Sequence, residues 1–163
     1  MRHLFPLPGR FGGPRDGKFL FTFALSLLPL TATLGCAADY ARVLHITAKL
    51  QAAADNASLG SIAKRSPGFK AAGSMMEDGV ISVGIADATC LFQRQMTGVR
   101  GYQLDSLTPL VAKAGSSLTS TVSFTAHVPS RFLGLLGMRM VTVQGVASSN
   151  GRLPQIDASA IQA

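Results

Sequence analysis

The residue types that most often carry chemistry are few in this chain of 163 residues, and they are far apart. There are three histidines and two cysteines: His3, His45, His127, Cys36 and Cys90. No Cys/His spacing among them suits a metal site, and two cysteines are too few for a disulfide scaffold. We therefore expect two unpaired thiols, no metal and no cofactor.

Hydrolytic chemistry would require a nucleophile, a base and an acid that the fold brings together. The candidates in the C-terminal part of the chain are Ser82, Asp87, Ser123 and His127. No Gly-x-Ser-x-Gly elbow and no paired-carboxylate motif positions them. The sequence therefore predicts no catalytic residues, no small-molecule substrate and a function exerted by contact.

The positive charge of the chain is concentrated at its beginning. The formal net charge is +7, and the first eighteen residues hold four basic residues and one acidic residue. The later basic residues are scattered, without a basic helix or interleaved aromatics, so we expect no nucleic-acid binding. Basic residues beside an apolar segment are retained on the cytoplasmic side of a membrane. Residues 1–18 are therefore predicted to be a basic cytoplasmic N-terminus.

The segment that positions everything else is Phe19 to Ala38, twenty residues without a charge. A helix of that length rises about 30 Å, which matches the hydrocarbon thickness of a bilayer. We expect a single transmembrane helix over residues 19–38, with the bulk of the chain outside. Pro29 lies inside this segment and is expected to kink it.

The helical pattern continues beyond the apolar segment. Residues 39–63 lack proline, are rich in alanine and leucine, and place one apolar stripe at spacings of three and four: Val43, Ile46, Leu50, Ala54 and Ala57. The opposite side carries Asp39, Arg42, His45, Lys49 and Asn56. This pattern predicts an amphipathic helix that emerges from the bilayer and packs its stripe against a sheet. Gly60 and the sequence from Lys64 to Gly68 mark its end.

The residue pattern of 64–149 is typical of a β-rich domain. Alternation and β-branched runs predict strands at 80–85, 118–128 and 139–147, and a short helix is expected at 129–137. Residues 92–117 are interpreted as a further strand and a loop, and the tail 150–163 as poorly ordered. The predicted fold class is α+β: a long N-terminal transmembrane helix that continues into a small antiparallel β-sheet domain, a pilin-like architecture.

The N-terminal residues resemble the TadE/TadG-like proteins, the assembly proteins of the bacterial tight-adherence (Flp) pilus. The resemblance covers 16–62 and combines an uncharged span, an Asp-Tyr-x-Arg border and a following Leu-Gln helix. Its marker residues here are Asp16, Gly17, Pro29, Gly35, Asp39, Tyr40, Arg42, Leu50, Gln51 and Asp55. A weaker similarity, to the end of short TadG-like domains, runs from Val128 to Val143.

This resemblance implies a bacterial inner-membrane protein that exposes a domain to the periplasm and helps a pilus assemble or anchor. The implied partners are the membrane and other pilus-assembly proteins or pseudopilins. Major pilins carry a glutamate near the start of the apolar helix, and residues 19–38 contain no carboxylate, so the TadG side of the family fits better than a polymerising pilin. Asp39, Tyr40 and Arg42 also suit any membrane border, where aromatic rings and charges mark the end of the hydrocarbon.

An alternative interpretation treats the N-terminal apolar segment as a cleaved signal. Thr33 to Cys36 is similar to a lipoprotein signal, and Gly35-Cys36-Ala37 has the small-x-small pattern of ordinary cleavage. The product would be a secreted or lipid-anchored periplasmic protein.

Overall fold

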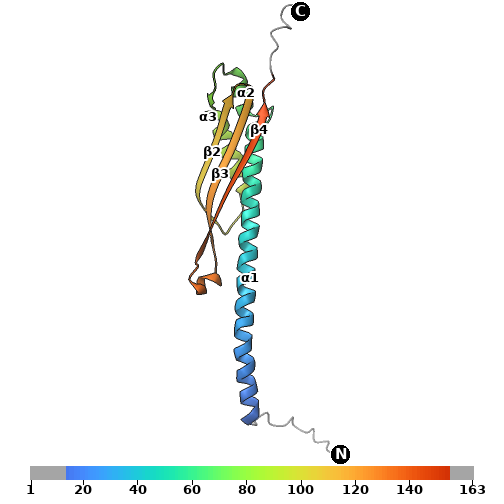
Figure 1. Cartoon of the computed structure of the whole chain (residues 1–163), viewed down its shortest axis with the longest axis vertical. Coiled ribbons are helices and arrows are strands. Elements are labelled where there is room, and N and C mark those ends of the chain that lie inside the picture. The colour runs from blue at the N-terminus through green and yellow to red at the C-terminus, as the bar shows by residue number, and fades with distance from the viewer. Residues whose placement is uncertain (1–13, 155–163) are drawn as a thin grey trace, which may run out of the picture.

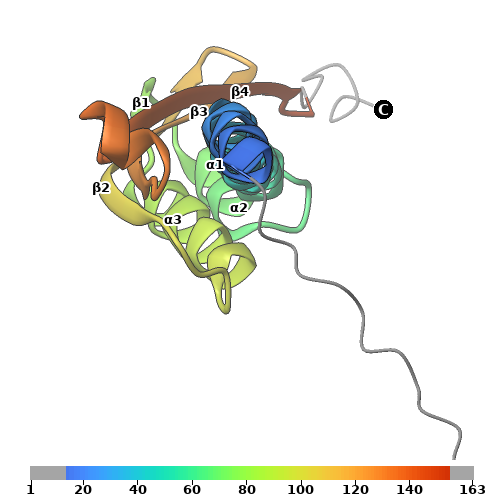
Figure 2. The ribbon, with the colours of Figure 1, turned by 90° about the horizontal axis from the view of Figure 1, so that it is seen from below.

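The structure, a computed structural model, describes residues 14–154. Its longest element is α1 (Pro14–Ser61), one helix of 48 residues. In Figure 1 the lower half of α1 stands free, and the upper half lies against the other elements. The continuous helix predicted over the apolar and amphipathic segments is therefore confirmed. The helix runs through Pro29, and Figures 1 and 2 show no sharp bend of the kind we expected there.

The rest of the fold is built on one antiparallel sheet. Its strands are β1 (Gly79–Val80), β2 (Gln103–Ala114), β3 (Ser117–Pro129) and β4 (Met140–Arg152), and they are hydrogen-bonded in the order β1-β2-β3-β4. β3 contains the predicted strand 118–128, and β4 contains the predicted strand 139–147 except for its first residue. The chain is thus α+β, a long apolar N-terminal helix followed by a four-stranded antiparallel sheet, as predicted.

Three shorter helical elements complete the fold: α2 (Pro67–Ser74), α3 (Ser82–Met96) and the 3₁₀ helix η1 (Leu133–Leu136). α2 begins at Pro67 because the Ser66 hydroxyl accepts a hydrogen bond from the Phe69 amide at 3.0 Å, as an N-cap does. η1 lies inside the short helix predicted at 129–137. It ends at Gly137, whose φ of 92° is the left-handed geometry that glycine adopts without strain.

Three assignments made from the sequence are corrected, the second of them only in part. The strand predicted at 80–85 is limited to the last residue of β1, because the chain enters α3 at Ser82. The further strand expected within 92–117 is present as β2, but the first residues of this region belong to α3. β4 continues to Arg152, so the chain is still paired at residues 150–152, where we expected a poorly ordered tail. Residues 155–163 lie outside the described part.

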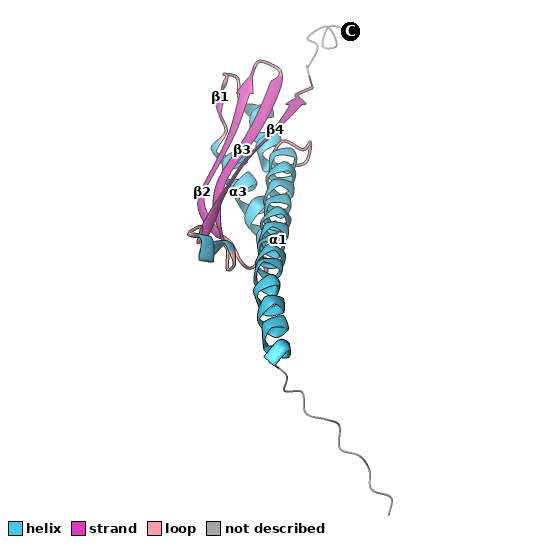
Figure 3. Cartoon of the chain, turned by 60° about the horizontal axis from the view of Figure 1, so that its bottom comes forward, coloured by secondary structure: helices cyan, strands magenta, loops and turns pink. Residues whose placement is uncertain are grey.

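The core lies between the sheet and the helices that cover one of its faces. Figures 2 and 3 show α1 and α3 side by side on the same face of the sheet. The buried side chains of β3 are those at even positions, and Val122, Phe124 and Ala126 meet Leu50 of α1 and Phe92 of α3 in the main cluster. The C-terminal half of α1 is therefore a part of the domain and not a stalk beneath it.

The buried stripe of α1 is longer than the predicted one. Ile46, Leu50, Ala54 and Ala57 are buried as expected, but the stripe begins earlier, at Gly35, and includes Asp39. Asp39 was predicted on the polar side of the helix and is only 6% exposed, so that prediction is wrong. The reason is a contact made by the chain between β3 and β4, described next.

Candidate membrane-border site

The segment that joins β3 to β4, residues 130–139, folds into a compact loop that we call the border loop. Figure 1 shows it, in orange, at the lower end of the sheet and beside α1. Phe132 of this loop packs on Gly35 of α1 so closely that a Cβ atom at Gly35 would overlap its ring. Gly35 is three residues from the end of the uncharged segment. The border loop therefore contacts α1 at the level where the predicted span ends.

Asp39 fixes the border loop to α1 one turn further along the helix. Its carboxylate Oδ2 accepts hydrogen bonds from the backbone amides of Phe132, at 2.6 Å, and Leu133, at 3.0 Å. These amides open η1, where N–H groups have no partner within the helix, so Asp39 acts as a cap supplied from a distant part of the chain. The Leu133 amide holds the pKa of Asp39 below its ordinary value, against the opposing effect of burial and with help from the Phe132 amide.

The other two residues of the predicted border lie on different sides of α1. Tyr40 is 62% exposed. Arg42 is half-buried, and its guanidinium lies against Gly101 in the connection between α3 and β2. Its charge also favours the ionised form of Asp39. The Asp-Tyr-x-Arg border thus places two side chains against the domain and leaves one aromatic ring free.

The later marker residues lie in the seam between α1 and the sheet. Leu50 is completely buried in the main cluster. The Gln51 amide donates to Oδ1 of Asp55 at 3.2 Å and to the backbone oxygen of Val146 in β4 at 3.3 Å. Asp55 itself is exposed and holds the Gln51 side chain toward the sheet. These residues join α1 to β4, and the sequence predicted this role only for Leu50.

The N-terminal half of α1 is not covered by other elements. Within residues 14–154, α1 is the one helix that is long and apolar enough to cross a membrane, and only 6% of its most apolar window is buried. A core helix of a soluble domain would be mostly covered, so that explanation of its apolarity does not apply here. Asp16 and Gly17 lie in the first turn of this helix, and Pro29 lies near the middle of the uncharged segment.

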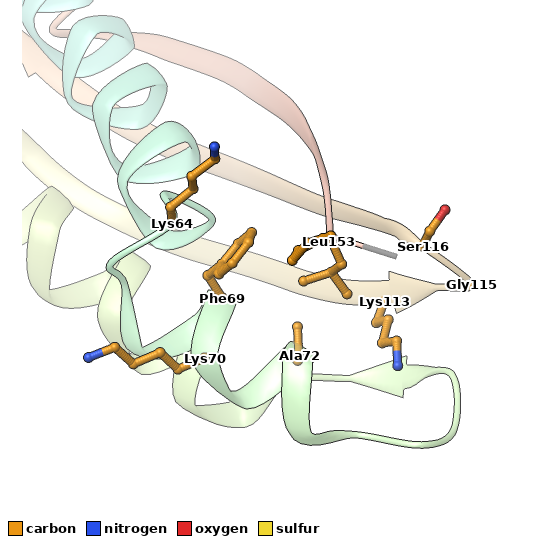
Figure 4. A pocket seen from close by; sticks show the side chains of 10 residues that line it. Lys64, Phe69, Lys70, Ala72, Lys113, Gly115, Ser116 and Leu153 are labelled. Carbon is orange, nitrogen blue, oxygen red and sulfur yellow. The ribbon is translucent and has the colours of Figure 1, made fainter. Parts of the chain in front are cut away.

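A pocket of about 590 Å³ lies at the opposite end of the domain, where the last described residues cross α2 (Figure 4). Phe69, Ala72 and Leu153 surround it, and lysines lie around its rim. The Lys70 amine points away from the cavity in Figure 4, and the Lys113 amine donates to the backbone oxygen of Met75. The lysines do not converge on one point, so the pocket is an apolar recess and not a built anion site.

The residues that first suggested chemistry are not brought together. His127 lies on the open face of the sheet and contacts the Thr142 hydroxyl at 3.1 Å. Asp87 lies in α3, which covers the opposite face. Cys36 and Cys90 are both free, as expected, and within residues 14–154 no cluster of His, Cys, Asp and Glu is suited to a metal ion. His3 lies outside the described residues.

Comparison with known proteins identifies one family. Residues 17–63 match the family model described as "Putative Flp pilus-assembly TadE/G-like" (Tad). The match confirms the resemblance seen in the sequence, covers less than a third of the chain and ends two residues after α1. No curated protein and no solved structure matches the chain. The matched segment contains the uncharged half of α1 and the half that packs on the sheet.

The border loop is the part of this site that sequence reasoning missed. The short helix near 129–137 was predicted, but not its contact with α1, because Phe132 and Asp39 are 93 residues apart in the chain. One available signal was the apolar run Phe132-Leu133-Gly134-Leu135-Leu136 at the end of a strand, which is unusual for a solvent-exposed turn.

Proposed function

We propose that the chain is a single-pass inner-membrane protein that assists the assembly or anchoring of a Flp/Tad-type pilus through protein contacts. Its N-terminus is cytoplasmic, residues 19–38 span the membrane, and the domain lies in the periplasm. The observation that carries this proposal is the match of residues 17–63 to the Tad model on a single helix, bare in its first half and part of the domain core in its second.

The contact of Gly35 with Phe132 favours a retained anchor over the alternative of a cleaved signal. Cleavage before Cys36, or after Ala38, would remove the residue on which Phe132 packs. The border loop would then lose the contact of Phe132 with Gly35, while Asp39 still accepted hydrogen bonds from the loop backbone. A close contact between Phe132 and Gly35 is expected when residue 35 stays in the mature protein, and not when it is removed with a signal.

A non-enzymatic role is part of the same proposal. The family description names pilus assembly and no reaction. The nucleophile, base and acid candidates are distributed over both faces of the sheet and do not form a site. The partners we expect are other pilus-assembly proteins or pseudopilins, recognised through surfaces of the domain or the span.

The experiment that tests the membrane part is an intact mass of the protein from washed membranes, combined with thiol labelling of intact spheroplasts. A full-length mass, with Cys90 labelled by a membrane-impermeant maleimide in a Cys36→Ser variant, is the expected result. Cys90 is exposed on α3 and lies in the domain, so its labelling reports the side of the domain. A mass that begins at Cys36 with added lipid, or a soluble product that begins near Ala38, would refute the anchor.

The pilus part is tested by deleting the gene in its own host and measuring surface pilin after shearing. We expect the deletion to abolish Flp pili and the wild-type gene to restore them. Normal piliation in the deletion strain would contradict the assembly role while leaving the topology untouched.

A further inference from the structure

The border loop and the first residue of β4 carry apolar side chains that remain largely exposed in the described chain. Phe132 is 43% exposed, Met138 is 54% exposed, and Met140, the first residue of β4, is 52% exposed. All three lie at the end of the sheet beside which the bare half of α1 continues, with Met140 on the sheet face opposite to α1 (Figure 1). Exposed apolar groups concentrated on one loop mark a surface that contacts a partner or a membrane.

The level of this surface along α1 points to the membrane. Phe132 packs on Gly35, and Gly35 lies three residues inside the uncharged segment, which is about 5 Å at the rise of an α-helix. When residues 19–38 span a bilayer, the Phe132 ring lies at the boundary between hydrocarbon and headgroups. Tyr40, also exposed, lies on α1 at nearly the same level, as aromatic residues at membrane borders do.

Several backbone polar groups of the loop are satisfied internally, which is the requirement for backbone that enters this boundary. The Ser130 amide donates to the backbone oxygen of Arg139 at 3.0 Å, and the Ser130 hydroxyl donates to the backbone oxygen of Met138. The Met138 amide donates to Leu133 at 3.0 Å, and Asp39 accepts from the amides that open η1. The apolar side chains are therefore presented on a closed, hydrogen-bonded loop.

The charges beside the apolar surface suit a lipid headgroup layer. The charged side chains of the loop are Arg131 and Arg139, and both are exposed. The carboxylate held against the loop, Asp39, is only 6% exposed and faces the backbone amides of Phe132 and Leu133. Arginine binds phosphate through several donors, and cations close to an anionic membrane surface are attracted to it.

We propose that the border loop and the start of β4 insert Phe132, Met138 and Met140 into the outer interfacial layer of the same bilayer that α1 spans, with Arg131 and Arg139 on lipid phosphates. This inference rests on the retained span of the proposed function. It gives the domain a second membrane contact besides α1, so the domain has a fixed rotation and tilt on the membrane. The face of the sheet not covered by α1 and α3 is thereby held in one orientation toward pilus components.

Tryptophan fluorescence tests this proposal directly, because the chain contains no tryptophan. Single tryptophans are introduced into the full-length protein, reconstituted in vesicles of phosphatidylcholine and phosphatidylglycerol with or without brominated acyl chains. Met138→Trp is the test, and Phe132→Trp repeats it at the position that packs on Gly35. Leu28→Trp, in the bare half of α1, and Phe69→Trp, at the distal pocket, are the controls.

We expect Met138→Trp and Phe132→Trp to lose emission with shallow bromines and to shift to the blue relative to Phe69→Trp, which stays unquenched. Leu28→Trp is expected to be quenched most by deep bromines. If the loop variants are as unquenched as Phe69→Trp while Leu28→Trp is quenched, the loop proposal is wrong and the span stands. If Leu28→Trp is unquenched as well, the span and the proposed function both fail.

A second copy of the chain is the competing occupant of this surface. Bromine quenching that is independent of the protein-to-lipid ratio supports lipid contact. A blue shift of Met138→Trp that appears only at high protein density, without bromine quenching, would overturn the proposal in favour of self-association. Replacing both arginines by glutamine is expected to weaken quenching more in vesicles that contain phosphatidylglycerol than in phosphatidylcholine alone, and an equal effect would contradict the phosphate contact.

Discussion

The substitution Leu50→Ala tests whether the C-terminal half of α1 is a part of the domain core. Leu50 is fully buried and packs in the cluster that contains Phe92 and Val122. Removing a buried leucine side chain costs about 2 to 5 kcal/mol of unfolding free energy, depending on how far the neighbours close the cavity. The cluster around it includes Ala53 and Ala54, whose short side chains cannot extend into the space, so we expect about 3 to 5 kcal/mol.

The matched control is Leu59→Ala, nine residues further along the same helix. Leu59 is 59% exposed, and a surface change of this kind alters stability by about 0.5 kcal/mol or less. Both residues lie outside the predicted span, so membrane insertion is unchanged in either variant. Any difference between the two therefore reports packing against the sheet.

The assay is thermal unfolding of the full-length protein in detergent micelles, read as the fraction of the domain that survives a short trypsin pulse at each temperature. Each kcal/mol lowers the Tm of a domain of this size by about 4 °C, so Leu50→Ala is expected to lose roughly 12 to 20 °C and Leu59→Ala about 2 °C or less. Equal Tm values for the two variants would refute the shared core and make residues 39–61 a stalk.

Three further perturbations follow from individual contacts. The folded-state pKa of Asp39 is lowered, so the stability that this carboxylate contributes is present above its unfolded pKa of 3.8 and is lost as the pH falls through the folded pKa. Asp39→Asn should therefore lower the Tm at pH 7 and flatten the acid limb of a Tm profile from pH 2 to 7. An unchanged acid limb would contradict this role of Asp39. Gly84→Ala should lower the Tm, because the new Cβ would lie 2.9 Å from the Val111 side chain and overpacking costs about 1 to 3 kcal/mol. The control Gly73→Ala, where a Cβ would meet no atom within 4 Å, should raise the stability by up to about 1 kcal/mol. Leu27→Lys should cost about 2.5 to 3.5 kcal/mol of insertion and leave the membrane fraction, with Leu27→Phe as the control that stays.

The elements that the sequence predicted well are those in which a regular apolar repeat extends over many consecutive residues. The uncharged segment and the stripe through Ile46, Leu50 and Ala57 specify α1 over more than ten turns. The alternation of β3 is equally regular, since each of its even positions from Leu118 to Val128 is buried. In both cases the environment of a residue can be inferred from its near neighbours alone.

The helix α3 was missed because two signals in its sequence conflict. The β-branched residues between Val80 and Ile85 favour a strand, but Gly84, Ala88, Phe92 and Met96 recur every four residues and are all buried. The glycine and the alanine let the helix approach β2 and α1 closely, and small residues carry little weight in a hydrophobic pattern. Tertiary packing therefore decided against the local β propensity.

The candidate site was the part least accessible to sequence reasoning. Asp39 was assigned to the polar face of an amphipathic helix, and Gln51 was named only as part of the family resemblance, since nothing local shows that their partners lie in residues 132–146. Only the fold brings the border loop and β4 against these side chains. The membrane-border motif was recognised from its composition, but its contacts with the domain could not be.

The boundary of the family match has a physical consequence for this chain. The matched segment, residues 17–63, contains a buried stripe from Gly35 to Ser61 but not the surfaces that bury it. Phe132 covers Gly35, β4 accepts from Gln51, and the Ser120 hydroxyl accepts from the Ser61 hydroxyl at 2.8 Å. An apolar and partly hydrogen-bonding stripe of this length is unfavourable in water when uncovered. The matched helix and the unmatched residues 64–154 therefore fold as one unit, in which the sheet and the border loop cover the stripe of α1.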